Sequence, residues 1–97
     1  MCGTSQNPER SRRAISWFLY ILLCSDRSYY TGITPNVRYR LKLHQSGKGS
    51  KYTRDRLPVK LVYYMKFRNK SEARKMEIQI KGWTRKKKDL LIKGILE

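Results

Sequence analysis

The hydrophobic residues of the chain fall into three short segments separated by polar ones. Residues 16–24 and 29–33 are dense in aromatic and aliphatic side chains, and the turn-forming residues 25–28 divide them. This pattern predicts two strands joined as an antiparallel hairpin. Residues 59–67 predict a third strand, in which apolar and polar positions alternate imperfectly, so that both of its faces are expected to be partly covered.

Three helices are predicted between and after these strands. The first begins at Thr34-Pro35, where threonine suits the N-cap and proline the first turn, and it runs to about residue 46. The second covers 72–81 behind Ser71, and the third follows Thr84. In the order β-β-α-β-α-α, these elements predict an α/β protein of the α+β type, with a three-stranded antiparallel sheet flanked by about three helices.

Composition adds a strong positive charge to this picture. The 97 residues include 23 lysines and arginines against 7 acidic residues, a formal net charge of +16. Residues 15–97 are expected to form one small domain, after a basic and polar stretch, 1–14, that we expect to be a disordered tail. Such a field attracts polyanions, so nucleic acid is the expected partner, although basic surfaces also serve solubility or membrane-surface contacts.

Cysteine usage and hydropathy bear on the cellular compartment. Cys2 and Cys24 are the two cysteines, and they form neither a metal-ligand cluster nor a disulfide framework. The apolar run 17–24 is too short to span a bilayer, contains Tyr20 and lacks a small-residue cleavage site after it, which argues against a signal peptide. We therefore expect a cytoplasmic protein with reduced thiols and no membrane partner.

Five side chains stand out as candidates for chemistry, in the order Tyr20, Tyr30, Arg40, His44 and Glu77. A tyrosine in a basic pocket can have its pKa lowered and accept a proton from water in phosphodiester hydrolysis. Arg40 can donate paired hydrogen bonds to a phosphate, and His44 lies one turn further along the same predicted helix. Each also has a structural interpretation: the tyrosines as packing residues, Arg40 as a surface cation and His44 as a core histidine.

The position of Glu77 leaves two interpretations open. It adjoins the predicted apolar stripe of Ala73, Met76 and Ile80, where a lone carboxylate is a candidate ligand for Mg²⁺. It also lies four residues before Lys81, which is the spacing of a helical ion pair. Spacing alone favours neither.

In this order the candidate residues resemble the GIY-YIG nuclease superfamily, which includes the amino-terminal nuclease domain of a DNA-repair excinuclease. The chain is most similar to the small stand-alone bacterial members, through residues 17–20, 30–34 and 44–53, and the likeness covers about 16–93. It implies a metal-dependent endonuclease using Mg²⁺ or Mn²⁺. It also implies that Glu77 holds the metal, Arg40 contacts the phosphate, and both tyrosines line the site, one of them activating the attacking water.

The chain departs from the family pattern at several positions. Phe18 stands where the first motif has its glycine, and the second motif reads Tyr-Thr-Gly, with Thr31 in place of isoleucine. Ile33 replaces a lysine that is common in excinuclease relatives, and the family's carboxy-terminal asparagine has no clear counterpart. These departures bear on efficiency and substrate choice.

Two functions follow as expectations. The first is an endonuclease that cleaves single-stranded, flap or branched DNA, and RNA is also an open substrate. In this function Tyr20 is the general base and Tyr30 binds the water or phosphate, or the two tyrosines exchange these roles. His44 assists. The second is a non-catalytic nucleic-acid-binding module that retains the fold. A monomer is compatible with either. The expected nucleic-acid contacts are Lys48, Lys51, Tyr52, Arg54, Lys86 and Lys87.

Overall fold

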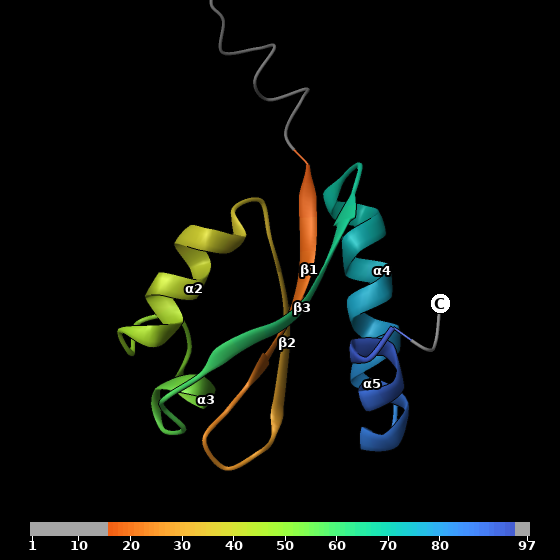
Figure 1. The fold of residues 1–97 in the computed structure, drawn as a ribbon. Helices are drawn as coiled ribbons and strands as arrows, with labels where there is room; N and C mark the ends of the chain where they lie inside the picture. The colour runs from red at the N-terminus through yellow and green to blue at the C-terminus, as the bar shows by residue number, and fades with distance from the viewer. Residues whose placement is uncertain (1–15, 95–97) are drawn as a thin grey trace, which may run out of the picture.

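A computed structural model describes residues 16–94 of the chain (Figure 1). The elements are β1 (Trp17–Leu23), β2 (Tyr29–Thr34), α2 (Val37–Gln45), α3 (Lys51–Arg54), β3 (Lys60–Phe67), α4 (Lys70–Lys81) and α5 (Arg85–Ile92). The sheet has the order β2-β1-β3 with antiparallel pairs, which confirms the predicted fold. The predicted tail, 1–14, lies outside the described residues. Between residues 16 and 94, no helix has the length and apolar content needed to cross a membrane.

The central strand β1 is covered on both faces. Leu19 and Ile21 are fully buried and pack with Ile80 of α4. Leu22 points to the opposite face, where Leu41 of α2 packs against it. Figure 1 shows α2 and α3 on one side of the sheet and α4 and α5 on the other. Burial on both faces explains why β1 has a continuous apolar run instead of an alternating pattern.

A bulge explains the imperfect alternation of β3. Ile21 pairs with Tyr63 and Leu22 pairs with Leu61, so that Val62 is an extra residue in β3. Such an insertion shifts the side-chain alternation by one position. Val62 and Tyr63 consequently both contact the core on the α4 side of the sheet.

Two helices begin at other residues than the sequence predicts. The cap of α2 is Asn36, because Thr34 still pairs with β1 at the end of β2. The cap of α4 is Asn69, two residues before the predicted Ser71. In each case the asparagine side chain accepts a backbone N–H of the first turn, at 3.0 and 2.9 Å respectively. Asparagine is as good an N-cap as serine or threonine, so residue type alone could not identify the starts.

The polar connection between α2 and β3 contains the one-turn helix α3, which periodicity did not predict. Gly47 has a φ of +85°, a left-handed conformation that lets the chain reverse direction after α2. Ser50 then caps α3 by accepting the backbone N–H of Thr53 at 3.2 Å. The reversal places α3 beside α2 and brings Thr53 against the end of that helix.

Candidate active site

The side chain of Tyr20 lies over the edge strand β2. Tyr20 pairs with Gly32 across the sheet, and a Cβ atom at Gly32 would lie 2.6 Å from the phenol oxygen. No heavy atom can be accommodated at that distance, so the ring occupies the space of the missing side chain. The glycine that follows Tyr30-Thr31 is therefore required by the position of Tyr20.

A chain of hydrogen bonds links Tyr20 to α2 and α3. The Tyr20 hydroxyl lies 2.8 Å from Nε2 of His44, and Nδ1 of His44 lies 2.8 Å from Oγ1 of Thr53. The next contact is with Oγ of Ser50, at 3.0 Å. His44 and Thr53 are 0% exposed and Tyr20 is 2% exposed. The network is thus shielded from water from the phenol to α3.

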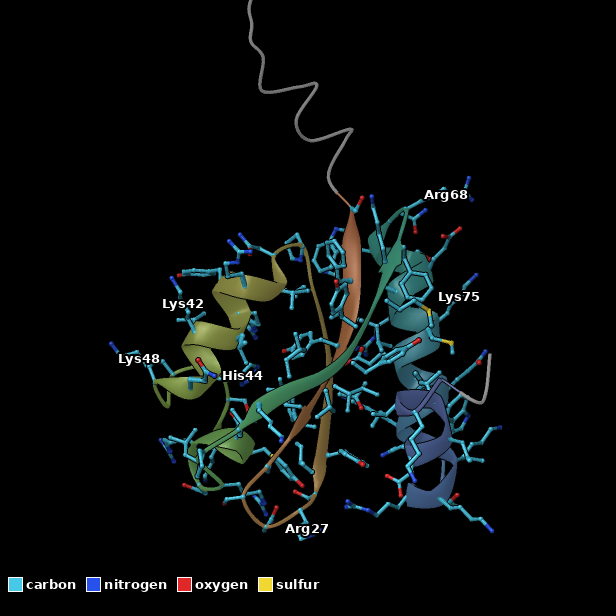
Figure 2. The ribbon with its side chains drawn as sticks, in the orientation of Figure 1. Arg27, Lys42, His44, Lys48, Arg68 and Lys75 are labelled. Atoms are coloured by element: carbon cyan, nitrogen blue, oxygen red, sulfur yellow. The ribbon has the colours of Figure 1, made fainter. Side chains whose placement is uncertain are left out.

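Lysines of the same region point away from this network. Figure 2 shows Lys42 and Lys48 extending outward from α2 and the turn that follows it, on the side away from the sheet. His44 is buried although it lies between them in sequence. The helix thus separates a buried polar side from an exposed cationic side.

Tyr30 lies within a group of aromatic rings. Its centroid is 5.1 Å from that of His44, 5.8 Å from that of Tyr52 and 6.3 Å from that of Tyr20. The guanidinium of Arg56 lies 3.9 Å from the Tyr52 centroid, on the face of that ring. Tyr30 itself is half-buried, so it is the more accessible of the two motif tyrosines.

The electrostatics correct one expectation from the sequence. Burial raises the pKa of Tyr20 to about 12. The guanidinium of Arg40 opposes this rise, whereas the neighbouring Tyr30 and Glu77 add to it. The surrounding cations therefore do not pull the pKa of Tyr20 toward neutrality. Burial and the charge of Arg40 lower the pKa of His44, so the imidazole is neutral at pH 7.

Arg40 extends from α2 into a groove of about 470 Å³ that is also lined by Trp17, Lys70 and Arg74. Its Nε is buried and has no acceptor within reach in the part of the chain that the structure describes. A buried donor without a partner costs about 1–3 kcal/mol, which a bound anion would offset. The position and charge of Arg40 therefore suit a phosphate.

Glu77 of α4 is 5% exposed and is paired with two cations. Its Oε1 accepts from Arg74 at 3.0 Å, and Oε2 lies 3.2 Å from Nζ of Lys81. The ion pair with Lys81, one of the two interpretations of the sequence, is therefore present. Two of these three charges are positive, so the cluster has a net positive charge that attracts an anion, and its Arg74 also lines the groove.

The same residues can be tested for their fit to a metal ion. Within residues 16–94 there is no group of three or more His, Cys, Asp or Glu that could hold one. Mg²⁺ is nevertheless often bound by one carboxylate, several waters and substrate phosphate oxygens. Arg74 and Lys81 have side chains that are 61% and 54% exposed, so they can move into solvent when a cation takes their place at the buried Glu77. Glu77 thus fits an ion that arrives with the substrate.

The residues predicted to contact nucleic acid divide between two places. Lys51 and Arg54 are exposed on α3, and Lys48 is exposed just before it. Lys86 and Lys87 are exposed on α5, which lies on the other side of the sheet (Figure 1). Tyr52, also on α3, is 37% exposed. Their contact with nucleic acid stays a prediction.

Two residues of the site were missed from the sequence. The hydroxyl of Thr53 contacts Nδ1 of His44, as described above. Gly49 packs on the same ring, since a Cβ atom there would lie 2.4 Å from Nδ1. Both belong to the segment 44–53, in which a glycine-rich turn and the single histidine lie close together. That proximity was the available signal.

Phe18, which replaces the glycine of the first motif, lies apart from this network. Its ring packs edge-to-face on Tyr64 of β3, with centroids 6.3 Å apart. It lines a separate groove between α2 and β3, together with Val37 and Leu41. The missing glycine therefore leaves the Tyr20–His44 contact intact.

Comparison with known proteins gives the class. A family model described as the GIY-YIG catalytic domain matches residues 16–89. The chain therefore belongs to the GIY-YIG family, a family of nucleases, as its ordered motifs indicated.

Within that class the relatives carry the name UPF0213. The chain is 52% identical to a UPF0213 protein of Bacillus pumilus over 75 residues, which are 77% of this chain and 76% of that protein. It is 51% identical to one of Oceanobacillus iheyensis over 75 residues, 77% of this chain and 87% of that protein.

Two solution NMR structures are similar to the fold described above. A UPF0213 protein of Bacillus halodurans is 46% identical, with a TM-score of 0.53, and the match covers 80% of this chain and 83% of that one. A protein of E. faecalis is 43% identical, with a TM-score of 0.57, and the match covers 81% and 84% respectively.

Proposed function

We propose that the protein is a divalent-metal-dependent endonuclease that hydrolyses DNA phosphodiester bonds. The observation that carries this proposal is the buried, unpartnered Nε of Arg40, which lines a groove with Arg74. Arg40 and Glu77 are both close enough to Tyr20 to affect the pKa of its phenol. An anion-binding donor, a proton acceptor and a carboxylate are the groups that phosphodiester hydrolysis requires. Membership in the GIY-YIG family supports the same reaction class.

Tyr20 acts as the general base together with His44. With its pKa raised to about 12, Tyr20 is a neutral phenol at pH 7 and cannot act as a free phenolate. His44 is neutral and lies 2.8 Å from the phenol oxygen, so it can take the phenol proton as Tyr20 takes one from the attacking water. Tyr30, the more accessible of the two tyrosines, orients the water or a phosphate oxygen.

Glu77 holds Mg²⁺ or Mn²⁺ in this proposal. The ion, when bound, supplies positive charge that stabilises the leaving oxygen. Arg40 donates to the scissile phosphate, whose negative charge increases in the transition state. Arg74 and Lys81 are the residues that the ion would displace from Glu77.

The substrate class follows from size and charge. A domain this small cannot bury a long duplex, which favours single-stranded, flap or branched DNA, and RNA is the further substrate to test. The second candidate function is a nucleic-acid-binding module without catalysis. One observation favours it: both oxygens of Glu77 are already paired with cations.

Replacing Glu77 with glutamine separates these functions. Glu77→Gln keeps the shape of the side chain but removes its charge, so cleavage should fall by at least roughly 10²-fold. DNA affinity should stay the same or rise slightly, because a negative charge is removed from a polyanion site. The matched control is Glu72→Gln on the same helix, which breaks an ion pair with Arg68 (2.9 Å) and should leave cleavage unchanged.

The measurement is single-turnover cleavage with Mg²⁺ and Mn²⁺ titrations on single-stranded, flap and duplex DNA and on RNA. Full activity in Glu77→Gln would remove Glu77 as the metal ligand. A wild-type protein that binds these substrates but cuts none of them would establish the binding module instead.

A further inference from the structure

The hydroxyl of Thr53 touches the side of His44 that faces away from Tyr20. Thr53 is fully buried, and its Oγ1 lies 2.8 Å from Nδ1 of the imidazole. Gly49 presses on the same ring, leaving no room for a side chain at that position. His44 is thus held between a phenol on Nε2 and a threonine on Nδ1.

The hydrogen bonds around Thr53 favour one direction for its contact with His44. The hydroxyl of Thr53 carries one proton, and it donates to the backbone carbonyl of Ser50 at 3.3 Å. The Ser50 hydroxyl oxygen accepts the backbone N–H of Thr53 and lies 3.0 Å from its Oγ1, to which it can also donate. With its proton directed to the Ser50 carbonyl, the oxygen of Thr53 offers a lone pair to Nδ1, and Nδ1–H is the donor in that arrangement.

The state of Nε2 then follows. A neutral imidazole has a single N–H, so a proton on Nδ1 leaves Nε2 bare to accept the Tyr20 hydroxyl at 2.8 Å. The opposite tautomer would donate from Nε2 to the phenol oxygen, and the phenol proton would need a new acceptor. The guanidinium of Arg40 beside the phenol has only donors.

We propose that Thr53 is a positioning residue for the reaction, because its hydroxyl holds His44 in the Nδ1–H tautomer and so keeps Nε2 free as the proton acceptor for Tyr20. Its catalytic part rests on the proposed nuclease function. In the step, the attacking water gives a proton to the Tyr20 oxygen, and the former Tyr20 proton moves to Nε2. The resulting imidazolium still donates from Nδ1 to Thr53, which itself gains and loses no proton.

The chain offers a direct readout, because His44 is its one histidine. Protein labelled with ring-¹⁵N histidine gives a single imidazole, and long-range ¹H–¹⁵N correlation shows which nitrogen carries the proton. The spectrum is recorded on the full chain without DNA or metal. We expect the Nδ1–H tautomer in the wild-type protein and in Thr53→Ser, which keeps the hydroxyl.

Thr53→Val keeps the shape of the side chain and removes the acceptor, so we expect His44 to change to the Nε2–H tautomer. Single-turnover cleavage at saturating DNA should fall by roughly 10²–10⁴-fold, the usual range for removal of a general base. DNA affinity should not change, and Thr53→Ser should cleave close to the wild-type rate. The backbone ¹H–¹⁵N spectrum checks that each variant is folded.

An Nε2–H tautomer in the wild-type protein would overturn the proposal without any variant, even if Thr53→Val did not fold. An unchanged tautomer in Thr53→Val would overturn it too, as would a changed tautomer with an unchanged cleavage rate. A wild-type protein that cuts nothing would overturn the nuclease function and the catalytic part of this proposal, whereas the spectrum alone decides the hydrogen bond.

Discussion

The guanidinium of Arg40 enters a groove in which its Nε has no acceptor among the described residues. Arg40→Met keeps the aliphatic stem and removes this donor, so the free energy of unfolding should stay the same or rise by about 1–3 kcal/mol. Cleavage should fall by roughly 10²–10³-fold, because a transition-state donor is removed. Chemical denaturation and single-turnover cleavage measure the two effects.

The matched control is Arg38→Met, which removes an exposed arginine from the same helix. It should change neither stability nor the rate at saturating DNA. If Arg40→Met destabilised the fold and its activity followed the folded fraction, Arg40 would be a structural residue and the phosphate contact would be wrong.

At this scale the sequence predicted some residues better than others. The order of Tyr20, Tyr30 and Arg40 could be read from motifs, because each lies on a regular element with recognisable flanking residues. The role of Gly32 became clear only when the Tyr20 ring was seen to occupy its side-chain space. Thr53 could not be predicted, since its contact with His44 depends on how the chain reverses after α2.

The elements themselves were predicted where many residues contribute to the signal. The strands and the helices α2, α4 and α5 each have a continuous or periodic apolar pattern. Helix α3 has four residues, too few for any periodicity, and only its cap Ser50 marks it. The helix starts at Asn36 and Asn69 were misplaced because neighbouring residues had equal capping ability.

The two basic regions, α3 with the preceding Lys48 and α5, lie on opposite sides of the sheet. They therefore test the shape of the substrate. Replacing Lys48, Lys51 and Arg54 with glutamine should weaken DNA binding and reduce its salt dependence by about 0.7–0.9 in slope for each phosphate that is no longer neutralised. Replacing Lys86 and Lys87 should do the same if the DNA also reaches α5. Binding isotherms at several salt concentrations give both slopes.

A rigid duplex cannot reach both sides of the sheet, whereas a single strand can. A reduced slope in both variants on the same substrate therefore indicates a flexible strand, and a reduced slope in the α3 variant alone indicates a one-sided path. The rate at saturating DNA should stay the same in both, because Tyr20, Arg40 and Glu77 are untouched. If the α5 variant kept the wild-type salt dependence of binding, its lysines would be a solvated surface that does not contact DNA.

For the whole molecule, the buried imidazole predicts a pH dependence of stability. Burial and Arg40 lower the pKa of His44 in the folded protein, whereas the unfolded chain takes up this proton near its ordinary pKa of 6.5. Below that pH the unfolded state binds more protons than the folded state, so the free energy of unfolding falls as pH falls through this window. Tyr20, Tyr30 and Arg40 are the other titratable groups that face the ring.

Urea unfolding between about pH 7.5 and 5 measures this effect. A His44→Gln variant, in which nothing titrates at this position, should show a nearly flat profile over the same range. Asp26 and Glu72 have lowered pKa values and act only at still lower pH. A wild-type profile as flat as that of the variant would mean that His44 is as easily protonated in the folded protein as in the unfolded chain.

The short helix α3 has a consequence for how the protein loses its structure on heating. One turn of helix cannot persist on its own hydrogen bonds and depends on its contacts with neighbouring elements. Residues 50–54 can therefore open to solvent at a much lower free energy than the central strand. Warming would release Thr53 from His44 while the sheet is still intact. The temperature limit of the proposed nuclease activity would then be set by this four-residue helix, below the temperature at which the core melts.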